Sequence, residues 1–104
     1  MSVLLEFSIF PLDQGESVSR EVSKVIEMIR ESGVSYQLTA MGTLIETDTV
    51  SQALEIVERA TQQLSAAGCN RIYSAIKMDI RSGKKSRMES KPGSIRKHIG
   101  EVNT

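Results

Sequence analysis

The chain has 104 residues, with 13 acidic and 13 basic side chains and a single cysteine, Cys69. This length fits one domain, and one cysteine excludes an internal disulfide, which fits a reducing compartment. The first ten residues lack the basic start and the cleavage site of a signal peptide. No stretch reaches the ~20 apolar residues of a membrane span. We therefore expect one cytoplasmic domain over residues 1–104.

The charges are divided between the two ends of the chain. Residues 1–70 carry ten acids and four bases, whereas residues 71–104 carry nine bases and three acids. Opposite charges of this kind favour contact between the two parts, within one molecule or between subunits. We predict that residues 83–104 form a basic tail that contributes to an oligomer.

The first third of the chain predicts a strand followed by a helix. Residues 3–10 alternate apolar and polar side chains, as a half-buried strand does. Apolar side chains then recur at helical spacing from Val18 to Ile29. Ser17 is the expected N-cap of this helix, and Gly33 is the expected left-handed residue that follows it.

The middle of the chain predicts a hairpin and a second helix. Residues 35–41 and 43–48 are short strand-like runs hinged at Gly42, where we expect a positive φ. Thr49 and Gln52 have the spacing of a capping box. The helix that follows places on one side Val50, Ala53, Leu54, Val57, Ala60, Leu64 and Ala67.

The last third predicts one more strand and a tail. Residues 71–81 alternate, with Ile72, Ser74, Ile76, Met78 and Ile80 on one face of the expected strand. Residues 82–93 are polar, basic and typical of a loop. A short final helix is expected around Ile95, Ile99 and Val102, which lie four and three residues apart.

The order β-α-β-β-α-β predicts an α+β domain of the ferredoxin-like type. In this fold an antiparallel four-stranded sheet carries both helices on one face, because the crossovers are right-handed. Here the fold is expected to end in a short C-terminal helix. The other face of the sheet is then open.

Polar side chains on the open face are the first candidates for a site. The first and third strands lie at the centre of such a sheet and the fourth borders the first, so five of these side chains are expected to converge: Glu6, Ser8, Glu46, Lys77 and Asp79. Apolar neighbours stand beside them at Leu4, Phe10, Leu44 and Tyr73.

Three interpretations of this face stay open. It is a solvated polar face, a surface covered by a second subunit, or a ligand pocket made by that cover. Glu46 has no basic neighbour in its own strand and is the better candidate to meet a cation. Lys77 and Arg81, on the same face as Asp79, are expected to hold that carboxylate when the site is empty.

Residue types needed for common catalytic chemistry are missing. With one cysteine and one histidine, His98, a single chain builds no zinc site of the usual kind. Neither a credible nucleophile with its base nor a glycine-rich phosphate loop is present. We therefore expect no catalytic residues, no metal, no cofactor and no enzymatic activity. The third strand carries acids and no aromatic side chain, which argues against RNA bound on the sheet.

Three segments resemble the thiamine-binding protein family of YkoF-like proteins. They are Leu-Thr-Ala-Met-Gly-Thr-Leu-Ile-Glu at residues 38–46, Phe-Ser-Ile-Phe-Pro-Leu at 7–12 and Lys-Met-Asp-Ile-Arg at 77–81. The resemblance extends over about residues 3–82. It implies a ferredoxin-like domain that pairs through its sheets, often as a dimer of dimers and hence a homotetramer. It also implies binding of thiamine or its aminopyrimidine moiety.

The open face and the family motif together give a candidate ligand site. Its members are Glu6, Ser8, Thr39, Met41, Gly42, Thr43, Glu46, Lys77 and Asp79. Carboxylates there suit the thiazolium cation and the amino donor of the pyrimidine, and Ser8 and Thr43 supply hydroxyls. The alternatives are a regulatory module resembling ACT domains that senses another small effector, and a structural oligomer without a ligand. Neither nucleic acid nor a membrane is an expected partner.

Overall fold

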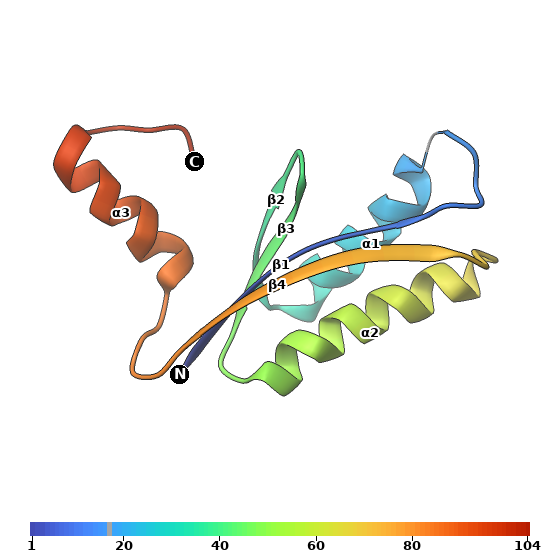
Figure 1. Cartoon of the computed structure of the whole chain (residues 1–104), viewed down its shortest axis with the longest axis horizontal. Helices are drawn as coiled ribbons and strands as arrows, with labels where there is room; N and C mark the ends of the chain where they lie inside the picture. Colours follow the sequence, from blue (N-terminus) through green and yellow to red (C-terminus); the bar gives the residue numbers. More distant parts are fainter. Residues whose placement is uncertain (17) are drawn as a thin grey trace.

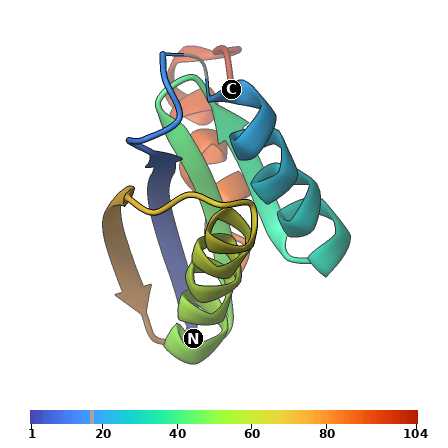
Figure 2. The ribbon, with the colours of Figure 1, turned by 90° about the vertical axis from the view of Figure 1, so that its right-hand side faces the viewer.

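The four strands form one antiparallel sheet in the order β2-β3-β1-β4. The computed structural model describes residues 1–16 and 18–104. The strands are β1 (Ser2–Pro11), β2 (Ser35–Thr39), β3 (Gly42–Thr47) and β4 (Ile72–Arg81). The helices are α1 (Ser19–Ser32), α2 (Val50–Ala66) and α3 (Arg87–Ile99). Two of the helices, α1 and α2, cover one face of the sheet, and α3 lies on the other side (Figures 1 and 2). The predicted ferredoxin-like architecture is confirmed.

The core lies between the sheet and the two covering helices. Strand β1 alternates fully buried side chains with half-buried ones, as the sequence pattern predicts. Its buried members are Val3, Leu5, Phe7 and Ile9, and they pack in one cluster with Val25, Met28, Ile29, Ile45, Ala53, Ile56, Ala60, Leu64 and Cys69. Burial of one such large side chain contributes about 1.5–3 kcal/mol. None of the helices in the described part of the chain is long and apolar enough to cross a membrane.

The predicted helix ends agree with the structure where they can be compared. Thr49 and Gln52 form the capping box, with each backbone N–H donating to the other side chain at 3.1 Å. Gly33 ends α1 in the left-handed conformation, with φ 81°. Ser17, the expected N-cap, lies outside the described residues, and Val18 stands directly before the helix.

The helices cover the sheet less completely than the sequence pattern predicts. On α2 the buried stripe runs through Ala53, Ile56, Ala60 and Leu64. Leu54, which the pattern placed on the buried side, is exposed because it lies beside this stripe and not on it. The helix-facing side chains of β4 after Ile72 are also exposed, because α1 packs on β1 and β2 and α2 packs mainly on β1 and β3. Figure 2 shows the two helices over the sheet.

The hairpin corrects the expectation for Gly42. The turn consists of Ala40 and Met41, Thr39 pairs with Gly42, and Gly42 is the first residue of β3. Its φ is not in the positive region. A Cβ at this position would lie 3.1 Å from the carbonyl oxygen of Phe7. Close approach to the neighbouring strand therefore favours glycine here, and a left-handed turn does not.

Replacing Gly42 with valine is expected to destabilise the protein by about 1–3 kcal/mol, the usual cost of overpacking. Chemical denaturation measures the change. Gly93→Ala is the matched control, because the added methyl group there meets open space and improves helix propensity. Equal stability of Gly42→Val and the wild type would show that β1 and the hairpin separate at little cost.

The segment expected to be a loop is largely helix. Residues 82–86 connect β4 to α3, which begins at Arg87 and runs through Pro92 and Gly93. Proline and glycine disfavour a helix interior, so the local sequence predicts a loop. The helix depends instead on contacts made by its first residues.

Candidate functional site

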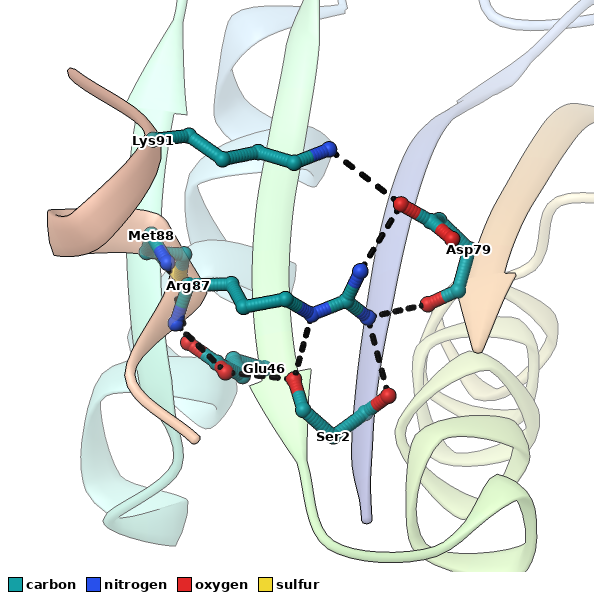
Figure 3. A network of polar contacts seen from close by, with 6 residues as sticks. All are labelled: Ser2, Glu46, Asp79, Arg87, Met88 and Lys91. Atoms are coloured by element: carbon teal, nitrogen blue, oxygen red, sulfur yellow. Dashed lines mark hydrogen bonds and ion pairs between the residues drawn. The ribbon is translucent and has the colours of Figure 1, made fainter. Parts of the chain in front are cut away.

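Arg87 is the centre of a polar network where the open face meets the start of α3 (Figure 3). Its side chain is only 3% exposed. The guanidinium donates to Ser2 Oγ at 3.0 Å, to Asp79 Oδ2 at 2.8 Å, and to the carbonyl oxygens of Ser2 at 2.8 Å and Asp79 at 2.6 Å. Lys91 Nζ also reaches Asp79 Oδ2, at 3.2 Å. A buried guanidinium with this many acceptors attaches α3 to the start of β1 and to the last residues of β4.

Glu46 caps α3 from the neighbouring strand. Its Oε2 accepts from the backbone N–H of Arg87 at 2.9 Å, and its Oε1 accepts from that of Met88 at 3.1 Å. Ser2 Oγ donates to the same carboxylate at 2.6 Å. Ser86, at the usual capping position, makes no side-chain cap. A carboxylate at a helix N-terminus satisfies free N–H groups and opposes the helix dipole, so Glu46 replaces the local cap.

Both carboxyl groups titrate below their ordinary range. Burial raises the pKa of Glu46, but the hydrogen bonds from Ser2, Arg87 and Met88 outweigh this effect and lower it overall. Hydrogen bonding from Lys91 lowers the pKa of Asp79, with Arg87 acting in the same direction against a smaller desolvation effect. Each carboxylate is thus held in its charged form by the start of α3.

Stability is expected to fall in acid partly because these pKa values are lowered. A carboxyl group with a depressed pKa in the folded state stabilises the fold above its ordinary pKa, near 4. That stabilisation is lost as the pH falls through the lower folded value. Melting temperature measured between about pH 2 and 6 should therefore drop below about pH 4, and drop less steeply in Glu46→Gln. Asp13, whose pKa is lowered by the backbone N–H of Asn70, contributes in both proteins. If the melting temperature falls equally with pH in the wild type and in Glu46→Gln, Glu46 does not contribute to the loss of stability in acid.

The five polar side chains of the open face do not form one cluster. Glu6 and Lys77 stand opposite each other on β1 and β4 and form an ion pair at 3.1 Å, largely exposed on the lysine side. Asp79 is held by Arg87 and Lys91, so the expectation that Lys77 and Arg81 hold it is wrong. The sequence pattern places Lys77 beside Asp79 on one face of the strand. The cross-strand register places Lys77 opposite Glu6, which is its partner.

Five of the nine predicted site residues gather elsewhere, around a groove at the tip of the hairpin. The hairpin groove has a volume of about 390 Å³ and is lined by residues 7–10 and 38–43 together with Val18, Val22, Val25 and Ile26. It contains Ser8, Thr39, Met41, Gly42 and Thr43 of the predicted set. Within it the hydroxyl of Thr39 is engaged by the turn, donating to the Gly42 carbonyl oxygen at 2.8 Å.

The groove exists because β1 is longer than its neighbour. The last pair between β1 and β3 is Phe7 with Thr43, and β1 continues to Pro11. Beyond that pair, the described sheet leaves one side of β1 without a strand. Apolar side chains of α1 close the space from below, so the groove has an apolar wall and a polar strand edge.

A second cavity, of about 510 Å³, lies between the hairpin strands and the start of α3. Polar and charged side chains dominate its lining, among them Gln37, Asp48, Lys85 and Glu89. Ligand pockets in proteins are mostly apolar with a few placed polar groups. The hairpin groove fits that description better.

Two members of the Arg87 network have no recognisable signal in the sequence. Ser2 and Arg87 lie 85 positions apart, and Arg87 falls in a segment that reads as a loop. The side chains of α1 that line the hairpin groove belong to an apolar stripe that is recognisable in the sequence. The stripe alone does not show which of its residues lie in the core and which line the groove.

Comparison with known proteins identifies the family. The model of the thiamine-binding protein family matches residues 5–96. The UPF0045 protein Mb1933 of Mycobacterium bovis is 37% identical over 99 residues, which cover 95% of this chain and 96% of the relative. The UPF0045 protein MJ1052 of Methanocaldococcus jannaschii is 34% identical over 103 residues, or 96% of this chain and 94% of the relative.

Solved structures agree with this result. The crystal structure of the hypothetical protein MJ1052 superposes with a TM-score of 0.77 at 34% identity, over 97% of this chain and 98% of that one. The structure of TM0486 from Thermotoga maritima, a protein provisionally assigned to thiamine biosynthesis or salvage, gives a TM-score of 0.78 over 92% of this chain and 100% of that one. At 18% identity it supports the fold alone. The chain belongs to the thiamine-binding protein family.

Proposed function

We propose that this protein binds thiamine or its aminopyrimidine moiety in the hairpin groove, without catalysing a reaction, and that it does so as a homo-oligomer. The observation that carries the proposal is the groove itself. It brings five residues of the candidate site beside an apolar wall, in a chain whose family is described as thiamine-binding. A pocket of this size and character suits a small planar ring.

The chemistry of the groove supports an aminopyrimidine better than a fully charged ligand. The wall from α1 and β1 is apolar, which favours an aromatic ring. Ser8 supplies a hydroxyl that both donates and accepts, and the unpaired side of β1 supplies backbone donors and acceptors to an amino group and ring nitrogens. The cationic thiazolium would lie toward Glu6, two residues from Ser8 on the same face of β1.

Direct contact of the ligand with Glu46 and Asp79 is the competing prediction from the sequence. A ligand that used Glu46 would compete with the backbone N–H groups of Arg87 and Met88 for the same oxygens. A ligand in the hairpin groove avoids that competition. We therefore assign Glu46 and Asp79 to the attachment of α3 and place the ligand at the other end of the sheet.

Exposed apolar surface on α3 supports self-association as a dimer or a dimer of dimers. Ile95 and Ile99 are 50% and 70% exposed. The radius of gyration is 15.0 Å, compared with about 13 Å for a compact chain of this length. The difference fits a helix that stands away from the body of the domain (Figure 1) and offers its apolar residues to another subunit.

Calorimetric titration with a panel of ligands tests the proposal. Thiamine and its aminopyrimidine fragment are expected to bind, whereas amino acids and short RNA are not. Ser8→Ala should weaken thiamine binding by up to about tenfold, the value of one neutral hydrogen bond, with Ser74→Ala on β4 as the control. Binding of an amino acid instead would support the regulatory-module alternative, and no heat with any compound would support a purely structural oligomer.

A further inference from the structure

The hairpin groove offers no charge to a ligand, whereas thiamine carries a permanent positive charge on its thiazolium ring. Among the residues that the structure describes, the groove is lined by apolar side chains, hydroxyls and a glycine. An aminopyrimidine fits such a lining. A thiazolium ring buried there would lose its hydration without gaining a charged partner, which is unfavourable. The charged half of an intact ligand therefore needs a second surface beside the groove.

Two aromatic side chains form such a surface on the open face of the sheet. Phe10 on β1 stands opposite Tyr73 on β4, and their ring centroids lie 5.6 Å apart. Phe10 also lines the hairpin groove, and Tyr73 is 53% exposed. This aromatic platform, Phe10 with Tyr73, is thus continuous with the groove and accessible from solvent.

Small side chains separate the aromatic platform from a carboxylate. Ser8 on β1 and Ala75 on β4 form the next opposite pair on the open face, and Glu6 follows on β1. Neighbours on one face of a strand lie about 7 Å apart, because each residue rises about 3.4 Å. A flat five-membered ring placed over Ser8 and Ala75 therefore has the aromatic platform on one side and the carboxylate on the other.

Gly42 keeps this carboxylate accessible from the groove. Gly42 lines the groove, and a Cβ at this position would lie 3.8 Å from Cγ of Glu6. A larger side chain would thus lie against Glu6, whose own side chain is 42% exposed. A ligand that enters the groove can reach Glu6 because this position has no side chain.

We propose, on the basis of the function proposed above, that the aromatic platform and Glu6 bind the thiazolium ring, so that the site selects intact thiamine over its aminopyrimidine moiety. The quaternary nitrogen of the ring has no proton to donate in a hydrogen bond. Its charge is instead attracted to aromatic faces, as in the recognition of quaternary ammonium groups, and to a carboxylate. The pyrimidine remains in the hairpin groove.

Lys77 is the cation that a ligand displaces from Glu6. The two side chains form an ion pair at 3.1 Å, and the lysine is 83% exposed. A pair at the surface contributes little to stability, and the lysine stem is flexible. The thiazolium ring therefore replaces the ammonium group at small cost, and Lys77 weakens binding of a cationic ligand while it remains nearby.

Titration calorimetry with three compounds separates the two halves of the ligand. The compounds are thiamine, its aminopyrimidine fragment, and an uncharged isostere with a thiophene ring in place of the thiazolium. Thiamine should bind roughly tenfold more tightly than the isostere, the combined effect of exposed cation–π contacts and one surface ion pair. Equal affinities for thiamine and the isostere would overturn this selectivity but leave the hairpin groove as the ligand site. No binding of any compound would contradict the proposed function and the selectivity together.

Variants of Tyr73 test the aromatic platform directly. Tyr73→Leu should weaken thiamine binding by about two- to fivefold and leave binding of the aminopyrimidine fragment unchanged. Tyr73→Phe, which keeps the aromatic face, should bind thiamine as the wild type does. Unchanged thiamine binding by a folded Tyr73→Leu protein, or equal losses for thiamine and the fragment, would overturn the assignment of Tyr73.

Lys77→Ala provides a test with the opposite sign. Removal of the competing cation should strengthen thiamine binding by up to about fivefold, because a surface ion pair is worth at most about that factor. Binding of the uncharged isostere should not change. Weaker thiamine binding by Lys77→Ala would contradict the placement of the thiazolium ring beside Glu6.

Discussion

Replacing Arg87 with alanine is expected to release α3 from the sheet while the sheet itself stays folded. The guanidinium donates four hydrogen bonds to Ser2 and Asp79, and bonds that involve charged groups contribute about 1.5–3 kcal/mol each. The outer part of α3 is exposed, so the rest of the helix does not compensate. Hydrogen exchange of the α3 amides should accelerate by roughly 30-fold or more, since 1.4 kcal/mol is one decade.

The control for this experiment is Lys77→Ala on β4. It removes a surface ion pair with Glu6, which is worth at most about 1 kcal/mol, and α3 exchange should be unchanged. Glu46→Gln should accelerate the exchange of the α3 amides less than Arg87→Ala does. The glutamine side chain still accepts one of the two backbone hydrogen bonds, but the negative charge at the N-terminus of α3 is lost. Slow α3 exchange in Arg87→Ala would show that the helix is held by other contacts, and global unfolding would show that the network supports the core.

Filling the hairpin groove is expected to abolish ligand binding. Val22 lies on α1 and lines the groove, and tryptophan at that position occupies a large part of the space with its indole ring. We expect Val22→Trp to weaken thiamine binding by at least about 100-fold, which corresponds to about 2.7 kcal/mol. Isothermal titration of wild type and variant measures the change.

Lys24→Trp is the matched control for the groove. It adds the same ring to the same helix at a position that lines a different surface. A thermal melt of each variant separates loss of binding from loss of fold. If Val22→Trp remains folded and binds thiamine as tightly as the wild type does, the ligand does not occupy this groove.

The fold could be predicted because its signals are local. Alternation in residues 3–10, the capping box at Thr49 and Gln52, and the glycine after α1 each report on a few neighbouring residues. The order of elements then leaves few topologies, and the observed sheet order is the expected one. Periodicity also identified β4 correctly, although it gave no information on how far the helices extend over that strand.

The candidate site could be predicted only in part, because its geometry depends on register and on distant contacts. The open face was identified correctly, but pairing of Glu6 with Lys77 follows from the β1–β4 register. The attachment of Glu46 to α3 joins positions 41 residues apart, and the local sequence after residue 82 argues against a helix. Gly42 was identified as a special position for the wrong reason, since close packing on Phe7 and not backbone conformation favours glycine there.

Chemical-shift mapping by NMR during a titration with thiamine tests the central claim most directly. The proposal predicts saturable shifts of backbone amides in residues 7–10, 18–26 and 38–43, the segments that surround the hairpin groove. Amides near Glu46 and in α3 should stay unchanged. Shifts confined to α3 and its contacts with β3 and β4 would place the ligand on the carboxylates of the open face instead. If no amide shifts at millimolar thiamine, the proposed thiamine-binding function is contradicted.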